Sequence, residues 1–440
     1  MTPLLPAWFG TGHERRAKLF ACLAVVCLAI ATVGVLAAPS HPRLATDHER
    51  PENNTLIALQ GYQDDGRAIE VAPDGEIVWE YDGTDDVFDL EELGPGRVQI
   101  STADEIPDAR CPERYRNDGH ANCVRNSLKI VEQSTNETRW EYAWYDVELH
   151  EHELHDADHY TTEDGEDRWV MVDMGNDRVF AVDRDKEIVW EWNATDDYEM
   201  PDGMGPEADW THVNDVDRIE PGVFQISLRN FDTVAELRVA DDGSVSLRPV
   251  VGPNSFEGGE GPLYEQHNPD RLADDHLLIA DSEQDRIVEL NADGEIVWTF
   301  GGSGTLQWPR DADRLSNGHT LITDSYNERV LEIDENGDVV WEVTTGTLPY
   351  EADRLPGEGS ADRPTADEAG LADAGDPGNV VEKYLGYATA ISKYVLPNGV
   401  GEQFVPLLGG ALALLGAAIE GVRWRSNGRL RAWLAQRTDR

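Results

Sequence analysis

The chain has 440 residues, of which 86 are Asp or Glu and 36 are Lys or Arg, so its formal net charge is -50. Such a length holds several domains or one large repetitive domain and excludes a single small module. The negative field repels phosphate backbones, which excludes general binding to nucleic acid. An acidic surface with only five lysines, on a chain with enough apolar residues to fold, is typical of a salt-loving, halophilic archaeon-like source.

The first predicted element is a membrane helix over residues 19–38, an uncharged run of twenty residues that follows Arg15, Arg16 and Lys18. A run of this length covers the hydrocarbon core of a bilayer, and the positive flank predicts that residues 1–18 lie in the cytoplasm. A cleaved signal peptide is the alternative. Its apolar region is usually only about seven to fifteen residues long, which favours an uncleaved anchor.

Residues 50–356 contain a repeated fifteen-residue pattern. Each copy predicts a β-hairpin, because alternating β-branched and polar residues flank a turn that usually contains Asp-Gly or Asn-Gly. Two weaker copies begin at Leu128 and Ala235. The four clear copies are RAIEVAPDGEIVWEY (67–81), RVFAVDRDKEIVWEW (178–192), RIVELNADGEIVWTF (286–300) and RVLEIDENGDVVWEV (329–343).

A second recurring piece adds two strands before each hairpin and is clearest over 268–285 and 311–328. Four strands per unit and six units predict an all-β, six-bladed β-propeller. The first hairpin has no such strand before it, whereas PYEADRLPG (349–357) supplies one after the sixth. We therefore expect this late strand to complete the first blade and close the ring. Recurrent tryptophans are expected to pack between blades, namely Trp79, Trp140, Trp190, Trp298 and Trp341.

The four cysteines form two pairs. Cys22 and Cys27 lie in the first apolar run, whereas Cys111 and Cys123 flank a short loop in the second blade. An exported location favours a disulfide between Cys111 and Cys123, and two buried free thiols are the alternative.

The C-terminal part predicts a second membrane anchor. Residues 357–379 are an acidic Gly/Pro/Ala linker, 380–402 a juxtamembrane helix, 403–422 a transmembrane helix and 423–440 a basic cytoplasmic tail. Both positive flanks predict a cell-membrane protein whose residues 39–402 lie on the extracellular side.

A functional site is expected where the blades differ from one another. Each inner strand carries an Asp-Arg-Leu-type sequence, and the residue three positions before its Asp is expected to face a common channel. These positions, together with the positions two residues before them on the same strand face, bring imidazole, guanidinium and carboxylate groups together. The first set is His155, Asn214, His267, Arg310, Tyr350 and Phe88, and the second is Glu153, His212, Glu265 and Trp308.

Arg229 is a further candidate, because it stands where other blades have Ser282, Ser325 or Met174. The alternative interpretation is that Arg229 forms a surface salt bridge. A zinc site is an alternative for the stretch that holds His150, His152, His155 and His159. It contains no HEXXH motif, and no second cluster has metal-ligand spacing, so we predict neither a metal nor a cofactor.

Four segments carry a resemblance to a known family: DWTHVNDVDRI (209–219), ISLRN (226–230), EQHNPDRL (265–272) and WPRDADRLSNGHTLITDS (308–325). Together they resemble the arylsulfotransferase (aryl-sulfate sulfotransferase) family of β-propeller enzymes. The resemblance implies transfer of a sulfuryl group from an aryl sulfate to a phenolic or other hydroxyl acceptor, through a sulfated histidine and without a nucleotide donor. It implies that His267 is the nucleophile and that His155, His212 and Arg229 surround the sulfate.

Asn214, Arg310, Glu265 and Trp308 are the predicted substrate-binding residues. The chain contains no G-x-x-x-x-G-K-[ST] motif, which agrees with a reaction that uses no nucleotide. Two other functions stay open. One is a non-catalytic surface propeller that binds a glycan, peptide or protein partner, and the other is a metal-dependent hydrolase. The sequence does not indicate the oligomeric state.

Overall fold

The computed structural model divides the chain into two units, one of Met1–Ser40 with Tyr384–Arg440 and one of His41–Lys383. Not every residue in them is described. The described residues are 13–37, 43–47, 51–61, 65–116, 119–120, 122–147, 149–150, 152–202, 204, 209–256, 261–302, 304–356, 363–375, 383–384, 386–388, 407–420 and 422–423.

The first unit contains helix α1 (His13–Ala37) and a second helix over 407–420. The two helices pack closely, because a Cβ built on Gly410 would lie 3.5 Å from the Cβ of Cys27. Among the described residues, no helix is both long and apolar enough to cross a membrane. The predicted membrane helices over 19–38 and 403–422 are therefore not supported, and residues 38, 403–406 and 421 lie outside the described part.

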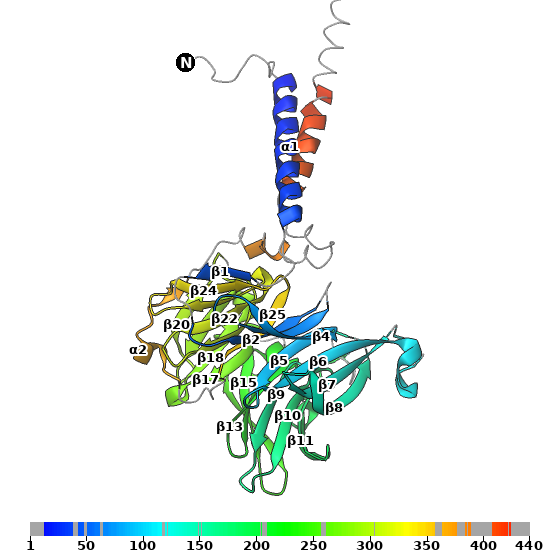
Figure 1. Cartoon of the computed structure of the whole chain (residues 1–440), viewed down its shortest axis with the longest axis vertical. Coiled ribbons are helices and arrows are strands. Elements are labelled where there is room, and N and C mark those ends of the chain that lie inside the picture. Colours follow the sequence, from blue (N-terminus) through cyan, green and yellow to red (C-terminus); the bar gives the residue numbers. More distant parts are fainter. Residues whose placement is uncertain are drawn as a thin grey trace, which may run out of the picture. The chain divides into compact units, whose positions relative to one another are not determined.

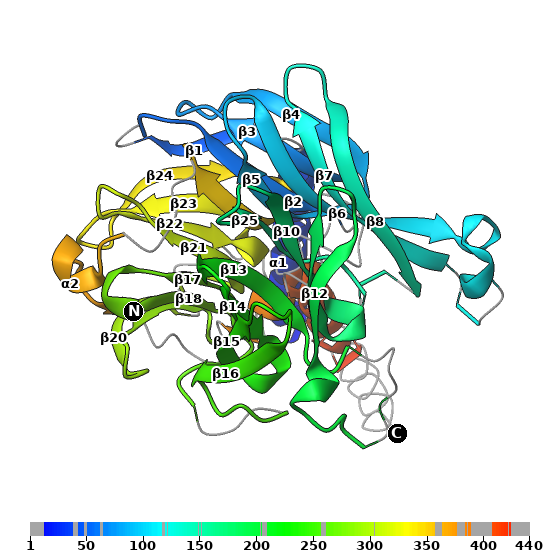
Figure 2. The same ribbon diagram turned by 90° about the horizontal axis from the view of Figure 1, so that it is seen from below.

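The second unit consists of six sheets, each with four antiparallel strands at its core, arranged around a common centre (Figures 1 and 2). It is a six-bladed β-propeller. From inner to outer strand, the first blade contains β25 (Leu348–Arg354), β2 (Thr55–Gln60), β3 (Gly66–Val71) and β4 (Ile77–Thr84), and the second contains β5 (Asp86–Glu92), β6 (Arg97–Pro107), β7 (Asn122–Glu132) and β8 (Glu137–Val147). The third contains β9 (Ala157–Thr161), β10 (Asp167–Asp173), β11 (Arg178–Asp183) and β12 (Ile188–Asn193), and the fourth contains β13 (Val213–Glu220), β14 (Val223–Leu228), β15 (Thr233–Val239) and β16 (Val245–Val251). The fifth contains β17 (His267–Arg271), β18 (Leu277–Asp281), β19 (Arg286–Leu290) and β20 (Ile296–Gly301), and the sixth contains β21 (Pro309–Arg314), β22 (Thr320–Asp324), β23 (Arg329–Ile333) and β24 (Val339–Thr344).

The predicted closure of the ring is confirmed. Strand β25 pairs antiparallel with β2, and Ile57 lies opposite Ala352. The last strand of the propeller thus completes the first blade, which ties the two ends of the repeat array into one sheet.

Two segments add strands that the repeat pattern did not predict. Strand β1 (Arg43–Asp47) extends the sixth blade beside β24, and β26 (Ala374–Gly375) extends the fifth beside β20. Just before β26 in the chain, helix α2 (Ala366–Ala369) donates its Ala366 N–H to Glu289. The carbonyl of Ala372, which follows α2, accepts from the Trp298 indole at 2.9 Å. The described part of the expected linker, 363–375, is therefore packed on the propeller.

The cores lie between the blades and use the recurrent tryptophans as predicted. Trp190, Trp298 and Trp341 belong to three different buried clusters. The indole N–H of Trp341 donates to Pro73 O of the first blade at 3.2 Å, and that of Trp79 donates to Asn136 of the second blade at 2.8 Å. Each such bond satisfies a polar atom and links neighbouring blades.

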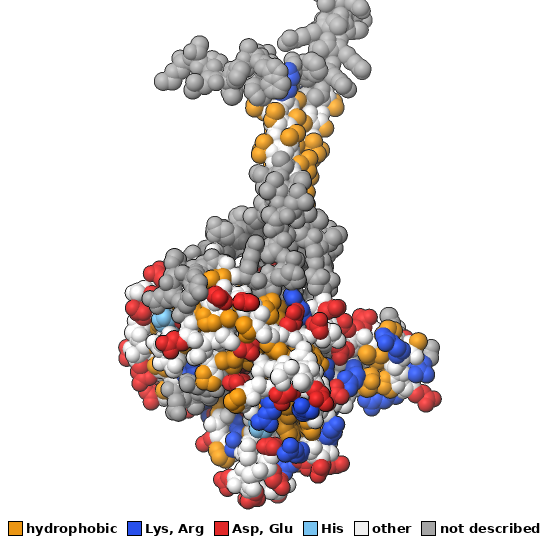
Figure 3. Space-filling model, in the orientation of Figure 1, with side chains coloured by type: hydrophobic (Ala, Val, Ile, Leu, Met, Phe, Trp, Pro, Cys, Tyr) orange, Lys and Arg blue, Asp and Glu red, His pale blue; other side chains and the backbone are white. Residues whose placement is uncertain are grey.

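The predicted disulfide between Cys111 and Cys123 is confirmed, with a Cα–Cα distance of 6.1 Å. It closes the tip of the long β6–β7 hairpin in the second blade. Cys22 and Cys27 of α1 are free thiols. Acidic side chains are spread over the visible face of the propeller and do not form a single patch (Figure 3).

Candidate active site

The inner strands bring six side chains together at the centre of the propeller. We call them the inner ring, and all are buried: Phe88, His155, Asn214, His267, Arg310 and Tyr350. The ring of His155 lies 4.6 Å from that of Phe88 and 5.3 Å from that of Tyr350, and His267 lies 6.3 Å from Tyr350. Contacts between side chains of different blades show that these positions converge, as the strand alternation predicted. Their chemical roles stay predictions.

His267 is the first residue of β17 and is only 1% exposed. Its Nδ1 lies 2.8 Å from the Ser282 hydroxyl, and that hydroxyl donates its own proton to Pro309 O at 2.7 Å. Because a hydroxyl has one proton, Ser282 accepts from His267, so Nδ1 carries the imidazole proton. Burial, followed by the charge of Arg310, lowers the pKa of His267 well below its usual value. Nε2 therefore keeps its lone pair.

His212 has the same arrangement with a different partner. Its Nδ1 lies 2.6 Å from a carboxylate oxygen of Asp209, which accepts a hydrogen bond from Nδ1–H and leaves the lone pair on Nε2. Burial, and then the charges of Arg229 and Arg310, lower the pKa of His212 well below its usual value. Asp209 was not among the predicted site residues; the only sequence signal for it is its acidic side chain three positions before His212.

His155 differs, because both of its ring nitrogens have partners. Nε2 lies 3.2 Å from Glu153, and Nδ1 lies 3.0 Å from the Tyr350 hydroxyl. Burial opposes the charge on Glu153, but its bonds to His150 and His155 outweigh this and lower its pKa to about 2. Burial lowers the pKa of His155 to about 4, so a neutral imidazole donates to Glu153 and accepts from Tyr350. His155 thus offers no free lone pair to a substrate.

Arg310 is the most unusual member of the ring. Its side chain lies 3.8 Å from the Trp308 ring centre and 4.6 Å from that of Tyr350, and the residue is 6% exposed. Within the described residues its Nε and Nη1 atoms have no hydrogen-bond partner, and no carboxylate forms an ion pair with it. Buried guanidinium groups are normally paired, so these N–H groups indicate a binding position for an anion.

Arg229 forms an ion pair with Glu265, in agreement with the salt-bridge alternative. It nevertheless lies beside His212, because its backbone N–H donates to His212 O at 3.2 Å. Burial is the largest cause of the lowered pKa values of His212 and His267, and the charge of Arg229 contributes to both. Both partners are partly exposed, at 21% for Arg229 and 27% for Glu265. This ion pair is therefore more accessible to solvent than the buried histidines of the site.

The remaining two candidates have structural contacts. The Asn214 amide donates to Gln266 O at 3.0 Å and thereby links the fourth and fifth blades, while its Oδ1 has no partner among the described residues. The Trp308 indole stacks on Tyr326 with ring centres 4.2 Å apart. Trp308 thus supports the guanidinium of Arg310 from one side.

Short turns position the residues around the inner ring. Met174, Arg229, Ser282 and Ser325 each begin a 3-10 turn, which confirms the predicted equivalence of these positions. The turns of the third, fourth and fifth blades end at Asp177, Asp232 and Asp285, which have positive φ values of 50°, 49° and 55°. Their carboxylates accept the backbone N–H groups of Thr211, Glu265 and Trp308 in the next blade, at 2.7, 2.8 and 3.0 Å. This repeated contact holds the loops that carry His212, Glu265 and Trp308.

Further along the same inner strands lies a cavity of about 320 Å³ that is lined from all six blades. We call it the carboxylate channel. Burial raises the pKa of Asp89 to about 8, with repulsion from Asp353 and Asp158 as further causes, and burial raises the pKa of Asp158 to about 7. Its acidic residues are Asp89, Glu91, Glu92, Asp156, Asp158, Asp215, Asp217, Asp270, Asp311, Asp313, Glu351 and Asp353.

A larger cavity of about 820 Å³ lies between the second and third blades, where Trp144, Asn176 and Trp210 are among its lining residues. None of its lining residues belongs to the inner ring. It is therefore separate from the histidines and Arg310.

Comparison with known proteins finds likenesses to solved structures at low identity only. No family model and no curated protein matches the chain. A protein of unknown function from Bacteroides caccae has 15% identity and a TM-score of 0.45, over 69% of this chain and 100% of the other. Virginiamycin B lyase from Staphylococcus aureus has 10% identity and a TM-score of 0.35, over 58% of this chain and 69% of the other.

A luciferin-regenerating enzyme has 13% identity and a TM-score of 0.40, over 73% of this chain and 99% of the other. At these values the likenesses transfer neither an activity nor a site to this chain. Neither membership of the arylsulfotransferase family nor a halophilic source is shown.

Proposed function

We propose that the protein is a sulfotransferase that moves a sulfuryl group from an aryl sulfate to a phenolic or other hydroxyl acceptor, with His267 as nucleophile and without a nucleotide donor. The observation that carries the proposal is the presence of both Arg310 and His267 in the inner ring. A buried guanidinium whose Nε and Nη1 have no partner in the described part of the chain and a neutral imidazole with an available Nε2 lone pair lie in one ring. Sulfuryl transfer requires such a nucleophile and a cation at the sulfate oxygens.

The transfer proceeds in two balanced steps. In the first, the lone pair on Nε2 of His267 forms an N–S bond while the S–O bond to the aryl group breaks, and the bonding electrons leave with the phenolate. In the second, the acceptor oxygen takes the sulfuryl group, and the N–S bond electrons return to Nε2. Arg310 and Arg229 hold the sulfate oxygens throughout.

His212 is the proposed proton carrier. In the free protein its pKa is well below the usual value, but an anionic ester beside it favours the protonated imidazole. Asp209 stabilises that cation by accepting a hydrogen bond from its Nδ1–H. The protonated Nε2 then donates to the departing phenolate and later receives the proton of the acceptor hydroxyl. His155, with both nitrogens engaged, orients this group by contacting His212 at a ring distance of 5.4 Å.

The cellular location belongs to the same proposal: a cell-membrane protein whose residues 39–402 face the extracellular side. The basic segments that precede and follow the two apolar runs and the Cys111–Cys123 disulfide support it. Protease treatment of intact cells should then digest the propeller, and full protection of the propeller would contradict this part.

The activity is tested with the full chain in molar salt, incubated with 4-nitrophenyl sulfate in the presence and absence of a phenol acceptor. We expect acceptor-dependent release of nitrophenol that is lost in His267→Ala and retained in His319→Ala, a histidine that pairs with Glu332 instead. Full transfer by a folded His267→Ala protein would exclude the mechanism. Absence of release with several donors would instead favour a propeller that only binds its ligand.

A further inference from the structure

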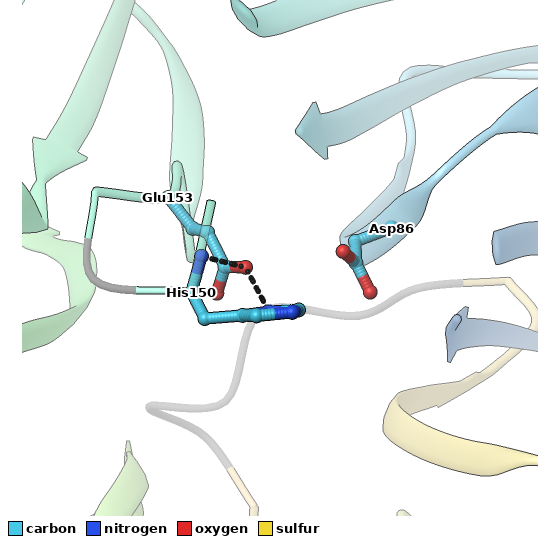
Figure 4. A group of neighbouring side chains, drawn as sticks. All are labelled: Asp86, His150 and Glu153. Atoms are coloured by element: carbon cyan, nitrogen blue, oxygen red, sulfur yellow. Dashed lines mark hydrogen bonds and ion pairs between the residues drawn. The ribbon is translucent and has the colours of Figure 1, made fainter. Parts of the chain in front are cut away.

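A second group of side chains lies where the second blade meets the loop that leads to the third. Asp86 begins β5, while His150 and Glu153 lie in the connection from β8 to β9. Each residue offers one ligand atom, and these three atoms lie within 4.8 Å of one another. The three side chains point toward a common position, as Figure 4 shows.

Asp86 provides an independent indication of a ligand. The residue is 1% exposed, and neither of its carboxylate oxygens has a hydrogen-bond partner of normal geometry among the described residues. Burial, and then the charge of Glu153, raise the pKa of Asp86 well above its usual value, and the nearby Gly61 N–H offsets only part of this. The like charge of Glu153 makes a buried, unpaired Asp86 still less favourable. A cation between the two carboxylates removes both costs.

We propose that Asp86, His150 and Glu153 bind a divalent transition-metal ion. One imidazole and two carboxylates match the ligand preferences of Zn²⁺ and Mn²⁺. The separation of 3.1 Å between His150 Nδ1 and Glu153 Oε1 equals the spacing of adjacent ligands about 2.1 to 2.2 Å from one ion. The His150 side chain is 51% exposed, which gives the ion an entry path and leaves room for water ligands.

The site also connects to the inner ring through Glu153. Its Oε1 faces His150, whereas its Oε2 contacts His155 at 3.2 Å. A metal bound at Oε1 therefore leaves the bond to His155 in place, and Glu153 becomes a carboxylate that bridges the ion and the imidazole. This binding does not depend on sulfuryl transfer, so it is testable without any substrate.

The experiment uses the full chain, freed of metal with a chelator and then titrated with Zn²⁺ or Mn²⁺ by calorimetry and by metal analysis after dialysis. We expect one ion per chain and a loss of affinity of at least about tenfold in Asp86→Asn, since removal of a ligand or its partner typically costs 10- to 100-fold. His150→Gln, at a partly exposed position, gives the same result without altering the core.

The matched control is Glu351→Gln. Glu351 belongs, with Asp89 and Asp156, to another acid group whose ligand atoms are equally close, but it lies in the carboxylate channel. Binding should be unchanged in this variant. Absence of stoichiometric binding, binding that survives both Asp86→Asn and His150→Gln, or binding lost in Glu351→Gln would each overturn the proposal.

Discussion

The inner ring and the carboxylate channel are built from the same six inner strands but have opposite chemistry. In the ring lies Arg310, whose Nε and Nη1 have no hydrogen-bond partner among the described residues, and the pKa values of the neighbouring imidazoles are lowered. In the channel, carboxylates crowd together, and their pKa values are raised by burial and mutual repulsion. An anion is therefore stabilised at the ring and repelled by the channel. Neighbouring positions along one strand of this fold thus create two different electrostatic environments.

The largest effect is expected from removing the charge that defines the ring. Arg310→Met should lower kcat/KM for an aryl sulfate by about 10²- to 10³-fold, the usual loss when one charge-stabilising donor is removed. Because Arg310 also depresses the pKa of His267, the same substitution should raise that pKa, which NMR titration of the imidazole can measure. Unchanged kinetics in a folded variant would show that Arg310 does not hold the sulfate.

The next effect concerns the proton on His267. Ser282→Ala removes the acceptor that keeps this proton on Nδ1, so we expect kcat to fall by about 10- to 100-fold through loss of the reactive tautomer. The matched control is Ser325→Ala, which changes the equivalent position of the next blade and should leave kcat unchanged. Equal effects of both substitutions would indicate a packing role for Ser282.

The acids of the carboxylate channel should make the stability of the protein depend on pH. The folded-state pKa of Asp89 is about 8, against an ordinary value of 3.8, so folded protein binds more protons than unfolded protein between these values. The free energy of unfolding should therefore fall as pH rises from 5 to 8, by at least about 1.4 kcal/mol, the equivalent of one pKa unit.

Denaturant unfolding at pH 5 and pH 8, in the same molar salt, measures this change. Asp89→Asn should reduce it, whereas Asp293→Asn, at an exposed turn, should leave it unaltered. Stability that increases toward pH 8 would show that the channel acids are paired with cations and not with one another.

The smallest effect is expected at the accessible edge of the ring, where Glu265 competes with a sulfate for Arg229. Glu265→Gln removes this competition, so KM for an aryl sulfate should fall by about threefold, a typical range for a partly exposed ion pair. The value of kcat should stay near that of the parent protein. An increase in KM would mean that Glu265 positions Arg229 for the substrate.

Much of the fold was predictable, because its signals are local. Alternation of apolar and polar residues with Asp-Gly turns indicated the hairpins, and the unattached strand at 349–357 indicated closure of the ring. The expected exported location favoured the disulfide between Cys111 and Cys123, which the structure confirms. The membrane helices were predicted from apolar runs, and the structure does not support them.

The site was predictable only in part. Strand alternation placed His155, His267 and Arg310 in one ring, but it gave no information about their partners. Ser282 and Asp209 set the protons on two histidines, and neither stood out as a contact of its histidine in the sequence. Asp86 is separated by more than sixty residues from Glu153, so no local pattern connects them.

The sequence by itself determined the repeated blades and the closing strand, because both depend on periodicity within short segments. Only the tertiary structure decided which inner positions become an anion site and which a channel of acids. It also decided that 363–375 packs on the fifth and sixth blades, through contacts such as Ala366 with Glu289. The physical reason is that burial and charge at the centre depend on six strands at once, and ring closure alone brings these strands together.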